Sequence, residues 1–202
     1  MDRFQNKYRI PSARLQTWDY RWAGAYFITI CTAGRECLFG DVIVETHGRA
    51  SLQLSAIGQI VNQEWDKSFE IRSELFCDAF IIMPNHLHAI LRIENNNLGS
   101  HGSHVETHGR ASLQTPQTPQ TIQRTGVAYR SPKSISSFVA GFKSSATKHI
   151  NEWRGTPKLP VWQSRFHDHI IRNDAEYQRI NDYIETNPEN WEKDKFFKSE
   201  EL

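Results

Sequence analysis

Cysteine is scarce in this chain of 202 residues, and no two cysteines form a Cys-x-x-Cys pair. The three that occur are Cys31, Cys37 and Cys77. This odd number and spacing argue against a disulfide framework and against a cysteine-rich zinc site. Because such cysteine use fits a reducing compartment, we expect a cytoplasmic protein.

Long apolar runs are also missing. No stretch approaches the roughly 18 apolar residues of a membrane-spanning helix, and the mean hydropathy is −0.61. The first residues, Met1 to Lys7, contain no apolar segment of the kind that a secretory signal needs. We therefore expect neither a membrane partner nor a secretory leader.

Apolar residues are nevertheless numerous enough for a core. Hydrophobic residues make up 38% of the chain and aromatic residues 11%, which excludes a fully disordered protein. The length suits one medium-sized domain that carries an insertion. We predict a single domain over residues 1–202.

The net charge of +1 conceals segments of opposite sign. Residues 1–35 carry six Lys or Arg against two Asp or Glu, and residues 130–172 carry eight against two. Residues 36–129 carry six basic against ten acidic side chains, and residues 173–202 carry four against nine. The basic segments can form one face for a polyanion such as nucleic acid, or they can pair with the acidic segments as an ordinary solvated surface.

The spacing of apolar residues predicts four strands and three amphipathic helices. The strands are expected over residues 26–32, 76–83, 86–93 and 161–170, and the helices over 53–70, 135–150 and 173–186. Pro84-Asn85 joins the second and third strands as an antiparallel hairpin. The order strand-helix-strand-strand-helix-strand-helix predicts an α+β protein, with a ferredoxin-like antiparallel sheet and helices packed on one face.

Residues 94–132 interrupt this pattern. They are poor in apolar residues and include a Gln-Thr-Pro repeat from Gln114 to Thr121, so we predict a flexible low-complexity insertion at about 94–132. The ten residues from Val44 to Gln53 recur unchanged from Val105 to Gln114. Two copies are too few for a solenoid. A duplicated DNA repeat explains them better, which makes His47 and His108 loop residues rather than ligands.

Two histidines, His86 and His88, follow the Pro84-Asn85 turn in an otherwise apolar strand. Side chains alternate along a strand, so both imidazoles project from one face, with Cα atoms about 6.6 Å apart. Both rings can then bind one metal ion. Two buried polar rings with ordinary hydrogen-bond partners would fit the pattern equally well, so the spacing leaves both roles open.

A second His-x-His pair, His167 and His169, flanks Asp168 in a more charged stretch. We expect a solvated, structural role for it rather than metal binding. The carboxylate nearest the first pair in the sequence is Asp78, on the preceding strand. We expect that residue to end or solvate its strand.

The last predicted helix carries two tyrosines on different parts of its surface. At 100° per residue, Tyr177 falls in the apolar stripe of Ile180 and Ile184, whereas Tyr183 and Asn187 lie about 40° apart on its shoulder. A pair four residues apart can present a hydroxyl and an amide oxygen to one point beside the sheet. Half-buried packing is the other interpretation of a tyrosine in this position.

Three segments occur in a characteristic order: FIIMPNHLH (Phe80 to His88), WQSRFHDHIIR (Trp162 to Arg172) and DYIETNP (Asp182 to Pro188). Together they resemble the REP-associated tyrosine transposases, a branch of the single-tyrosine HUH transposases of prokaryotes. The resemblance covers about residues 20–93 and 130–191, and leaves the insertion without a counterpart. The fold that it implies is also a ferredoxin-like sheet with helices.

The resemblance implies a metal-dependent enzyme that cleaves and rejoins single-stranded DNA. The family's histidine pair corresponds to His86 and His88, its nucleophilic tyrosine to Tyr183, and the amide that completes its metal site to Asn187. A divalent ion, Mg²⁺ or Mn²⁺, would bind the two imidazoles and the amide oxygen. Tyr183 would attack the scissile phosphate and leave a 5′-phosphotyrosine. The implied partner is hairpin-forming DNA from palindromic repeats, and the protein would act as a monomer or homodimer in a prokaryotic cytoplasm.

We expect the DNA contacts to come from the basic segments, with a tryptophan stacking on an unpaired base. The candidates are Arg130, Lys133, Lys143, Lys148, Arg165 and Arg172 for phosphates, and Trp162 or Trp22 for stacking on an unpaired base. Each of these side chains also has an ordinary interpretation as surface or core packing.

Two other functions fit the same residues. The first is a metal-dependent phosphodiesterase that uses water, with His167 and His169 joining the first histidine pair. The second is a nucleic-acid-binding protein that keeps the fold without the chemistry. A protein–DNA adduct that depends on Tyr183 separates both from a transposase.

Overall fold

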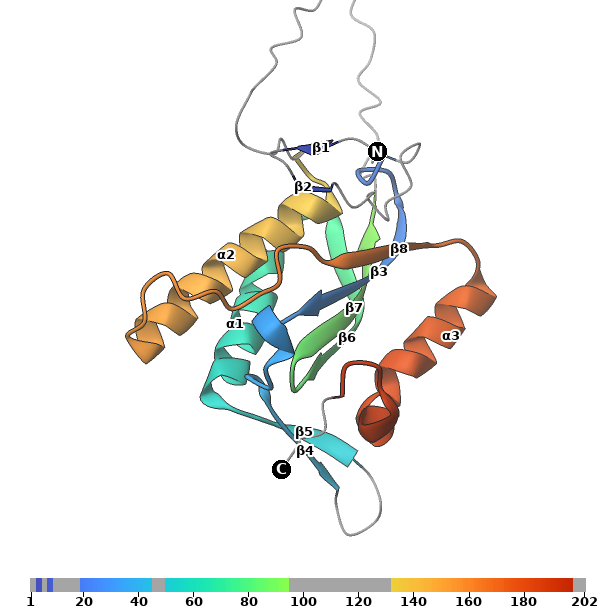
Figure 1. Ribbon diagram of the computed structural model, residues 1–202. Helices are drawn as coiled ribbons and strands as arrows, with labels where there is room; N and C mark the ends of the chain where they lie inside the picture. Colours follow the sequence, from blue (N-terminus) through green and yellow to red (C-terminus); the bar gives the residue numbers. More distant parts are fainter. Residues whose placement is uncertain (1–2, 5–6, 9–18, 45–49, 95–131, 198–202) are drawn as a thin grey trace, which may run out of the picture.

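A four-stranded antiparallel sheet with the strand order β6-β7-β3-β8 lies at the centre of the computed structural model (Figure 1). The structure describes residues 3–4, 7–8, 19–44, 50–94 and 132–197. The strands of the sheet are β3 (Gly24–Cys31), β6 (Leu75–Met83), β7 (His86–Ile93) and β8 (His167–Ile171). Helix α1 (Ala56–Glu70) connects β3 to β6, and β7 lies between those two strands. This is the split βαβ arrangement of a ferredoxin-like fold, so the predicted α+β class is confirmed.

The helices cover both faces of the sheet, not one face as the sequence predicts (Figure 1). Helices α1 and α2 (Ile135–Arg154) pack on the face that carries Ile28 and Leu87. Helix α3 (Asp174–Glu185) packs on the opposite face, where Ile180 and Ile184 contact Ile90. Both faces of the central strands are apolar, and an exposed apolar sheet face needs a covering layer.

A second hairpin, formed by β4 (Gly40–Val44) and β5 (Ala50–Leu54), precedes α1 and is absent from the sequence prediction. The predicted helix over 53–70 therefore begins too early. Ser55 ends the strand and starts the helix, because its side chain accepts a hydrogen bond from the Gly58 N–H at 3.0 Å. Leu54 fits both a strand and a helix by its spacing, and the pairing with β4 decides between them.

The predicted strand over 161–170 is regular only from His167 to Ile171. Val161 and Trp162 are instead buried in the core under α1 and α2, and Trp162 forms a single isolated bridge with Thr32. The remaining short elements are β1 (Arg3–Phe4), β2 (Lys7–Tyr8), η1 (Ala33–Arg35) and η2 (Pro188–Lys193).

Several predictions fall on residues that the structure does not describe. Residues 95–131, which make up nearly all of the predicted insertion, lie outside the described ranges, as do His47 and His108. The last four residues of the first decapeptide copy, 50–53, form part of β5. In the described ranges no helix is long and apolar enough to span a bilayer.

A close approach between α1 and the chain before β4 requires a glycine at position 58. A Cβ atom on Gly58 would overlap the backbone oxygen of Phe39, which cannot move aside as a flexible side chain could. We expect Gly58→Ala to lower the free energy of unfolding by about 1–3 kcal/mol. Gly141→Ala in α2 is the matched control, because a Cβ there meets nothing within 4 Å, and it should be neutral or stabilising by up to about 1 kcal/mol. Urea unfolding of both variants measures the difference, and equal effects would contradict this account.

Candidate active site

The two histidines of β7 are fully buried on the sheet face that α3 covers. His86 and His88 are 0% and 1% exposed, and their rings lie 4.5 Å apart between centroids. Strand alternation places them on this face with Ile90, while Leu87 and Ala89 turn to the opposite core. The predicted projection of both imidazoles from one face is therefore observed.

Hydrogen bonds to Nδ1 orient both imidazoles. The Nδ1–H of His86 donates to Oδ1 of Asn85 at 2.9 Å, because that amide oxygen can only accept. His88 Nδ1 lies 2.8 Å from Oγ1 of Thr29 on the neighbouring strand β3. Partners of this kind fix the ring orientation of metal-binding histidines and leave Nε2 for the metal. Nε2 of His86 is buried and, within the described part of the chain, has no hydrogen-bond partner.

The surroundings keep both histidines neutral. The pKa of His86 is lowered to about 3, mainly by burial and to a smaller extent by the nearby positive charges of Lys195 and Arg35. Burial also lowers the pKa of His88 well below its usual value, and the neighbouring His86 adds to that effect. Neutral imidazole is the form that binds metal ions.

Helix α3 brings Tyr183 and Asn187 to the same place. The Tyr183 hydroxyl oxygen is 3.2 Å from Nε2 of His88 and 3.2 Å from Oδ2 of Asp194. Asn187, at the end of the helix, is 2% exposed; its Nδ2 donates to Oδ2 of Asp194 at 3.3 Å, and its Oδ1 is buried with no described partner. Tyr177 instead packs among the apolar residues between α3 and the sheet. The sequence prediction that Tyr183 and Asn187 share the helix shoulder agrees with these positions.

The pKa of Tyr183 is raised to about 12, mainly by burial and also by the negative charge of Asp194 and its hydrogen bond with the phenol. The phenol carries one proton, so it can donate to Asp194 or to His88 but not to both. The ring is held by Phe27, whose centroid is 6.2 Å from that of Tyr183 and 5.2 Å from that of His88. The hydroxyl is thus positioned by packing as well as by hydrogen bonds.

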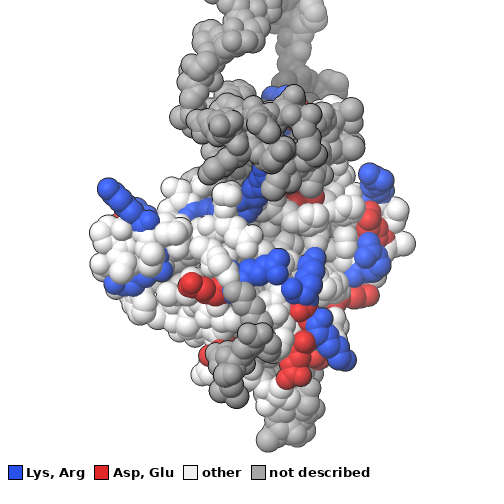
Figure 2. Space-filling view, in the orientation of Figure 1, with Lys and Arg blue, Asp and Glu red and all other residues white. Residues whose placement is uncertain are grey.

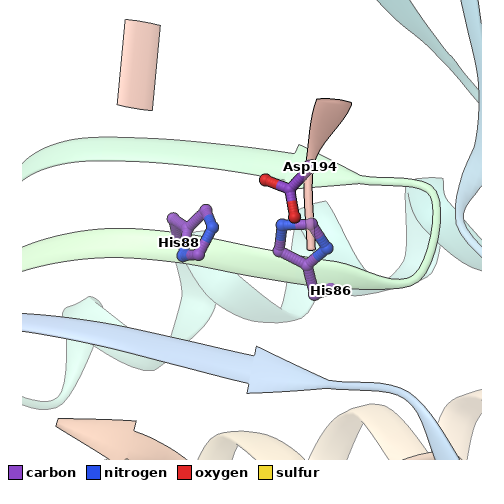
Figure 3. A group of neighbouring side chains, drawn as sticks. All are labelled: His86, His88 and Asp194. Carbon is purple, nitrogen blue, oxygen red and sulfur yellow. The ribbon is translucent and has the colours of Figure 1, made fainter. Parts of the chain in front are cut away.

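Asp194 is the functional candidate that the sequence analysis missed. It follows η2, and its carboxylate lies beside the two imidazoles (Figure 3). One potential ligand atom from each of His86, His88 and Asp194 lies within 4.8 Å of the others. The available signal was indirect: Trp191 and Phe196 flank Asp194, and such apolar spacing indicates that the segment is packed. Both aromatic residues are indeed buried.

These atoms fit a divalent metal ion. Two neutral imidazole nitrogens and a carboxylate oxygen form a mixed donor set that several divalent ions accept. Two buried acceptors on residues of this cluster, His86 Nε2 and Asn187 Oδ1, have no hydrogen-bond partner among the described residues. Buried polar atoms are normally paired, so a cation between them would account for both.

The predicted phosphate contacts are not gathered at this site. Lys143 and Lys148 belong to α2, which packs on the opposite face of the sheet. Lys143 donates to the backbone oxygen of Gln163, and Lys148 pairs with Glu152 at 3.9 Å. Lys133, Arg165 and Arg172 are exposed, and Arg130 lies outside the described ranges. Basic and acidic side chains are interspersed over the face seen in Figure 2. The proposed roles of these residues in DNA binding stay predictions.

Trp162 is a core residue, which corrects its predicted role as a stacking platform for a base. It is 7% exposed, and its ring packs 5.2 Å from Phe39 and 5.5 Å from Phe142. The ring is part of the apolar core between the sheet and the helices. Trp22, the other candidate, is 50% exposed and remains accessible.

The second histidine pair does not join the first. Nε2 of His169 lies 2.8 Å from a carboxylate oxygen of Glu176 in α3. His167 is exposed and faces Thr29 across the β3–β8 ladder. Asp78 forms an ion pair with Arg92 at 2.9 Å, so it is engaged within the β6–β7 hairpin as a structural residue.

The sheet order and the antiparallel hairpin define the class of fold to which the chain belongs. A solved structure of a REP-associated tyrosine transposase bound to a REP hairpin matches with a TM-score of 0.52 and 19% sequence identity. The match covers 89% of this chain and 73% of that chain. The chain therefore has the fold of that transposase, as the three sequence segments predict.

Comparison with known sequences places the chain in a family. No protein-family model matches it. An uncharacterized protein of Haemophilus influenzae is 33% identical over 186 residues, which is 92% of each chain. The chain belongs to the same family as this Haemophilus protein.

Proposed function

We propose that this protein is a single-tyrosine transposase that cleaves and rejoins single-stranded DNA at hairpin-forming repeats. One observation carries the proposal: the hydroxyl of Tyr183 lies 3.2 Å from Nε2 of His88, although the two residues are 95 positions apart. A nucleophile beside a set of metal ligands is the arrangement that phosphoryl transfer to a side chain requires.

His86 and His88 would hold the metal ion through Nε2, with an oxygen from Asp194 or Asn187 completing the set. Among the sequence-predicted ligands, Asn187 contributes a buried amide oxygen, and Asp194 adds a negative charge that the prediction did not include. When bound there, Mg²⁺ or Mn²⁺ would act as a Lewis acid that polarises the scissile phosphate. The protein supplies the fixed ligand geometry and excludes water around the two buried rings.

The proposed chemical step exchanges one phosphoester bond for another. The phenolic oxygen of Tyr183 forms a bond to phosphorus, and the bond from phosphorus to the 3′-oxygen breaks. The hydroxyl proton can leave along its hydrogen bond to Oδ2 of Asp194, and the departing 3′-oxygen takes a proton from water. The product is a 5′-phosphotyrosine with a free 3′-hydroxyl. Attack by a 3′-hydroxyl reverses the exchange and rejoins DNA.

The water-using phosphodiesterase fits the described residues less well. Such enzymes usually surround one or two metal ions with several carboxylates, whereas Asp194 is the carboxylate that the described chain places with His86 and His88. Tyr183 also occupies the position beside His88 where an attacking water would be expected. The hairpin-DNA substrate is proposed because the matched transposase structure is bound to a REP hairpin.

A covalent-adduct assay tests the proposal. Hairpin oligonucleotides are made from inverted repeats that flank the gene, and each is labelled at its 3′ end and incubated with the protein and Mn²⁺. The tyrosine retains the 5′-phosphate of the downstream fragment, so the 3′ label should migrate with the protein under denaturing conditions. Cleavage without an adduct would indicate hydrolysis by water. Tight binding without cleavage under any divalent metal would indicate a binding protein.

A further inference from the structure

Two cations from distant parts of the chain meet beside His86. The guanidinium carbon of Arg35 lies 5.1 Å from the centroid of the Phe196 ring, and Nζ of Lys195 lies 4.9 Å from the same centroid. That ring is itself 4.5 Å from the ring of His86. The Arg35 guanidinium also donates to the backbone oxygen of Lys195 at 3.4 Å. Both positive charges are thus positioned at the edge of the candidate metal site.

A buried amide holds this arrangement together. Nδ2 of Asn85 donates to the backbone oxygen of Arg35 at 3.2 Å and to that of Phe196 at 2.8 Å. Its Oδ1 accepts from His86, and the side chain is completely buried. One residue therefore fixes the two cation-bearing segments and the imidazole relative to one another. Such support by neighbouring hydrogen bonds is typical of a preorganised binding site.

The two cations have no acidic partner in the described part of the chain. Arg92 and Arg179, by contrast, each pair with a carboxylate. Among the described residues the adjacent Asp194 forms no ion pair with Lys195, and its carboxylate accepts hydrogen bonds from Tyr183, Asn187 and the backbone N–H of Phe196. Arg35 also has a left-handed backbone with φ of 58°, directly after Gly34 at 63°. A non-glycine residue is uncommon in that region, because its Cβ atom crowds the backbone there.

We infer that Arg35 and Lys195 bind a backbone phosphate of the DNA strand next to the scissile phosphate. The inference rests on the proposed function and adds a direction to it: the strand passes over the segment Asp194 to Phe196 on the His86 side of the site. Paired cations held beside an aromatic ring suit a phosphodiester, which carries one negative charge and two acceptor oxygens. Neither residue is among the sequence-predicted DNA contacts.

Salt-dependent binding of single-stranded DNA tests the inference. Binding of a fluorescent oligothymidylate of about 20 nucleotides is measured by anisotropy across a range of KCl concentrations, in the Tyr183→Phe background so that no cleavage intervenes. Each phosphate contact on single strands contributes about 0.7 to the slope of log K against log salt. Because both cations bind the same phosphate, Arg35→Gln and Lys195→Gln should each lower the slope by part of that amount, and the double variant by about 0.7. Arg35→Lys keeps the positive charge, so its slope should equal that of the Tyr183→Phe parent.

Lys158→Gln is the matched control, because Lys158 is exposed, has φ of 69° and lies after α2, away from the site. Its slope should not change. If a thermal melt shows that Arg35→Gln is not folded at the assay temperature, the slope of Lys195→Gln alone tests the inference. That substitution leaves the backbone hydrogen bonds of its segment in place. An unchanged slope in the double variant overturns the inference while the adduct assay of the unmodified protein still stands. A missing adduct overturns the proposed function whatever the slopes are.

Discussion

Replacing Tyr183 with phenylalanine abolishes formation of the covalent protein–DNA adduct and lowers the cleavage rate by at least about 10⁴-fold. The substitution removes one oxygen atom, which is the proposed nucleophile 3.2 Å from His88. The aromatic ring remains against Phe27, and the side chain is only partly buried, at 38% exposure. The fold should therefore be unaffected, and DNA binding should persist because no positive charge is lost. The measurement is the fraction of 3′-labelled strand that migrates with the protein under denaturing conditions.

Tyr177→Phe is the matched control, since it makes the same chemical change on the same helix. Tyr177 packs among Ile90 and its neighbours, away from the two imidazoles. Its variant should form the adduct at the rate of the unmodified protein. If Tyr183→Phe cleaves at an undiminished rate, the tyrosine mechanism is wrong and water becomes the nucleophile.

His86→Gln and His88→Gln should each weaken Mn²⁺ binding by about 100-fold or more. Loss of an outer hydrogen-bond partner of a ligand already costs about 10–100-fold in metal affinity, and these substitutions remove a direct ligand. Calorimetric titration with Mn²⁺ measures the affinity without DNA, so the result does not depend on cleavage. Adduct formation should fall in parallel and should recover partly at high Mn²⁺ concentration.

His149→Gln is the control for metal binding, because His149 lies on α2 and contacts Glu64 at 3.0 Å on the other side of the sheet. The affinity of the His149→Gln variant for Mn²⁺ should equal that of the unmodified protein. Asp194→Asn and Asn187→Ala, measured in the same way, show which of the two oxygens completes the ligand set. Normal Mn²⁺ affinity in both histidine variants would show that the imidazoles do not bind the metal.

Much of the candidate site follows from local sequence pattern. The two-residue periodicity of a strand is enough to put His86 and His88 on one face, and the helical period is enough to separate Tyr177 from the shared shoulder of Tyr183 and Asn187. Both depend on positions close together in the chain, for which backbone geometry leaves few choices. The α+β class and the hairpin at Pro84-Asn85 follow for the same reason.

Other features depend on contacts between distant segments. Asp194 has no periodic relation to the histidines, and it reaches them because η2 turns the chain back after α3. The placement of α3 on the opposite sheet face depends on which surface the other helices leave uncovered. The sequence places Trp162 in a predicted strand as a candidate for stacking on a base, yet its ring is buried in the core between the sheet and α2.

The sequence by itself determined the type of most elements, the split βαβ order, and which of the side chains His86, His88, Tyr183 and Asn187 share a face of their own element, because these depend on periodicity and on short motifs. Tertiary structure alone decided that the phenol meets the imidazoles, that Asp194 joins them, and that Asn85 holds Arg35 and Lys195 at the edge. The physical reason is that periodicity specifies the direction of a side chain along its own element. The distance between two elements is set by how their apolar surfaces pack together, which no local pattern contains.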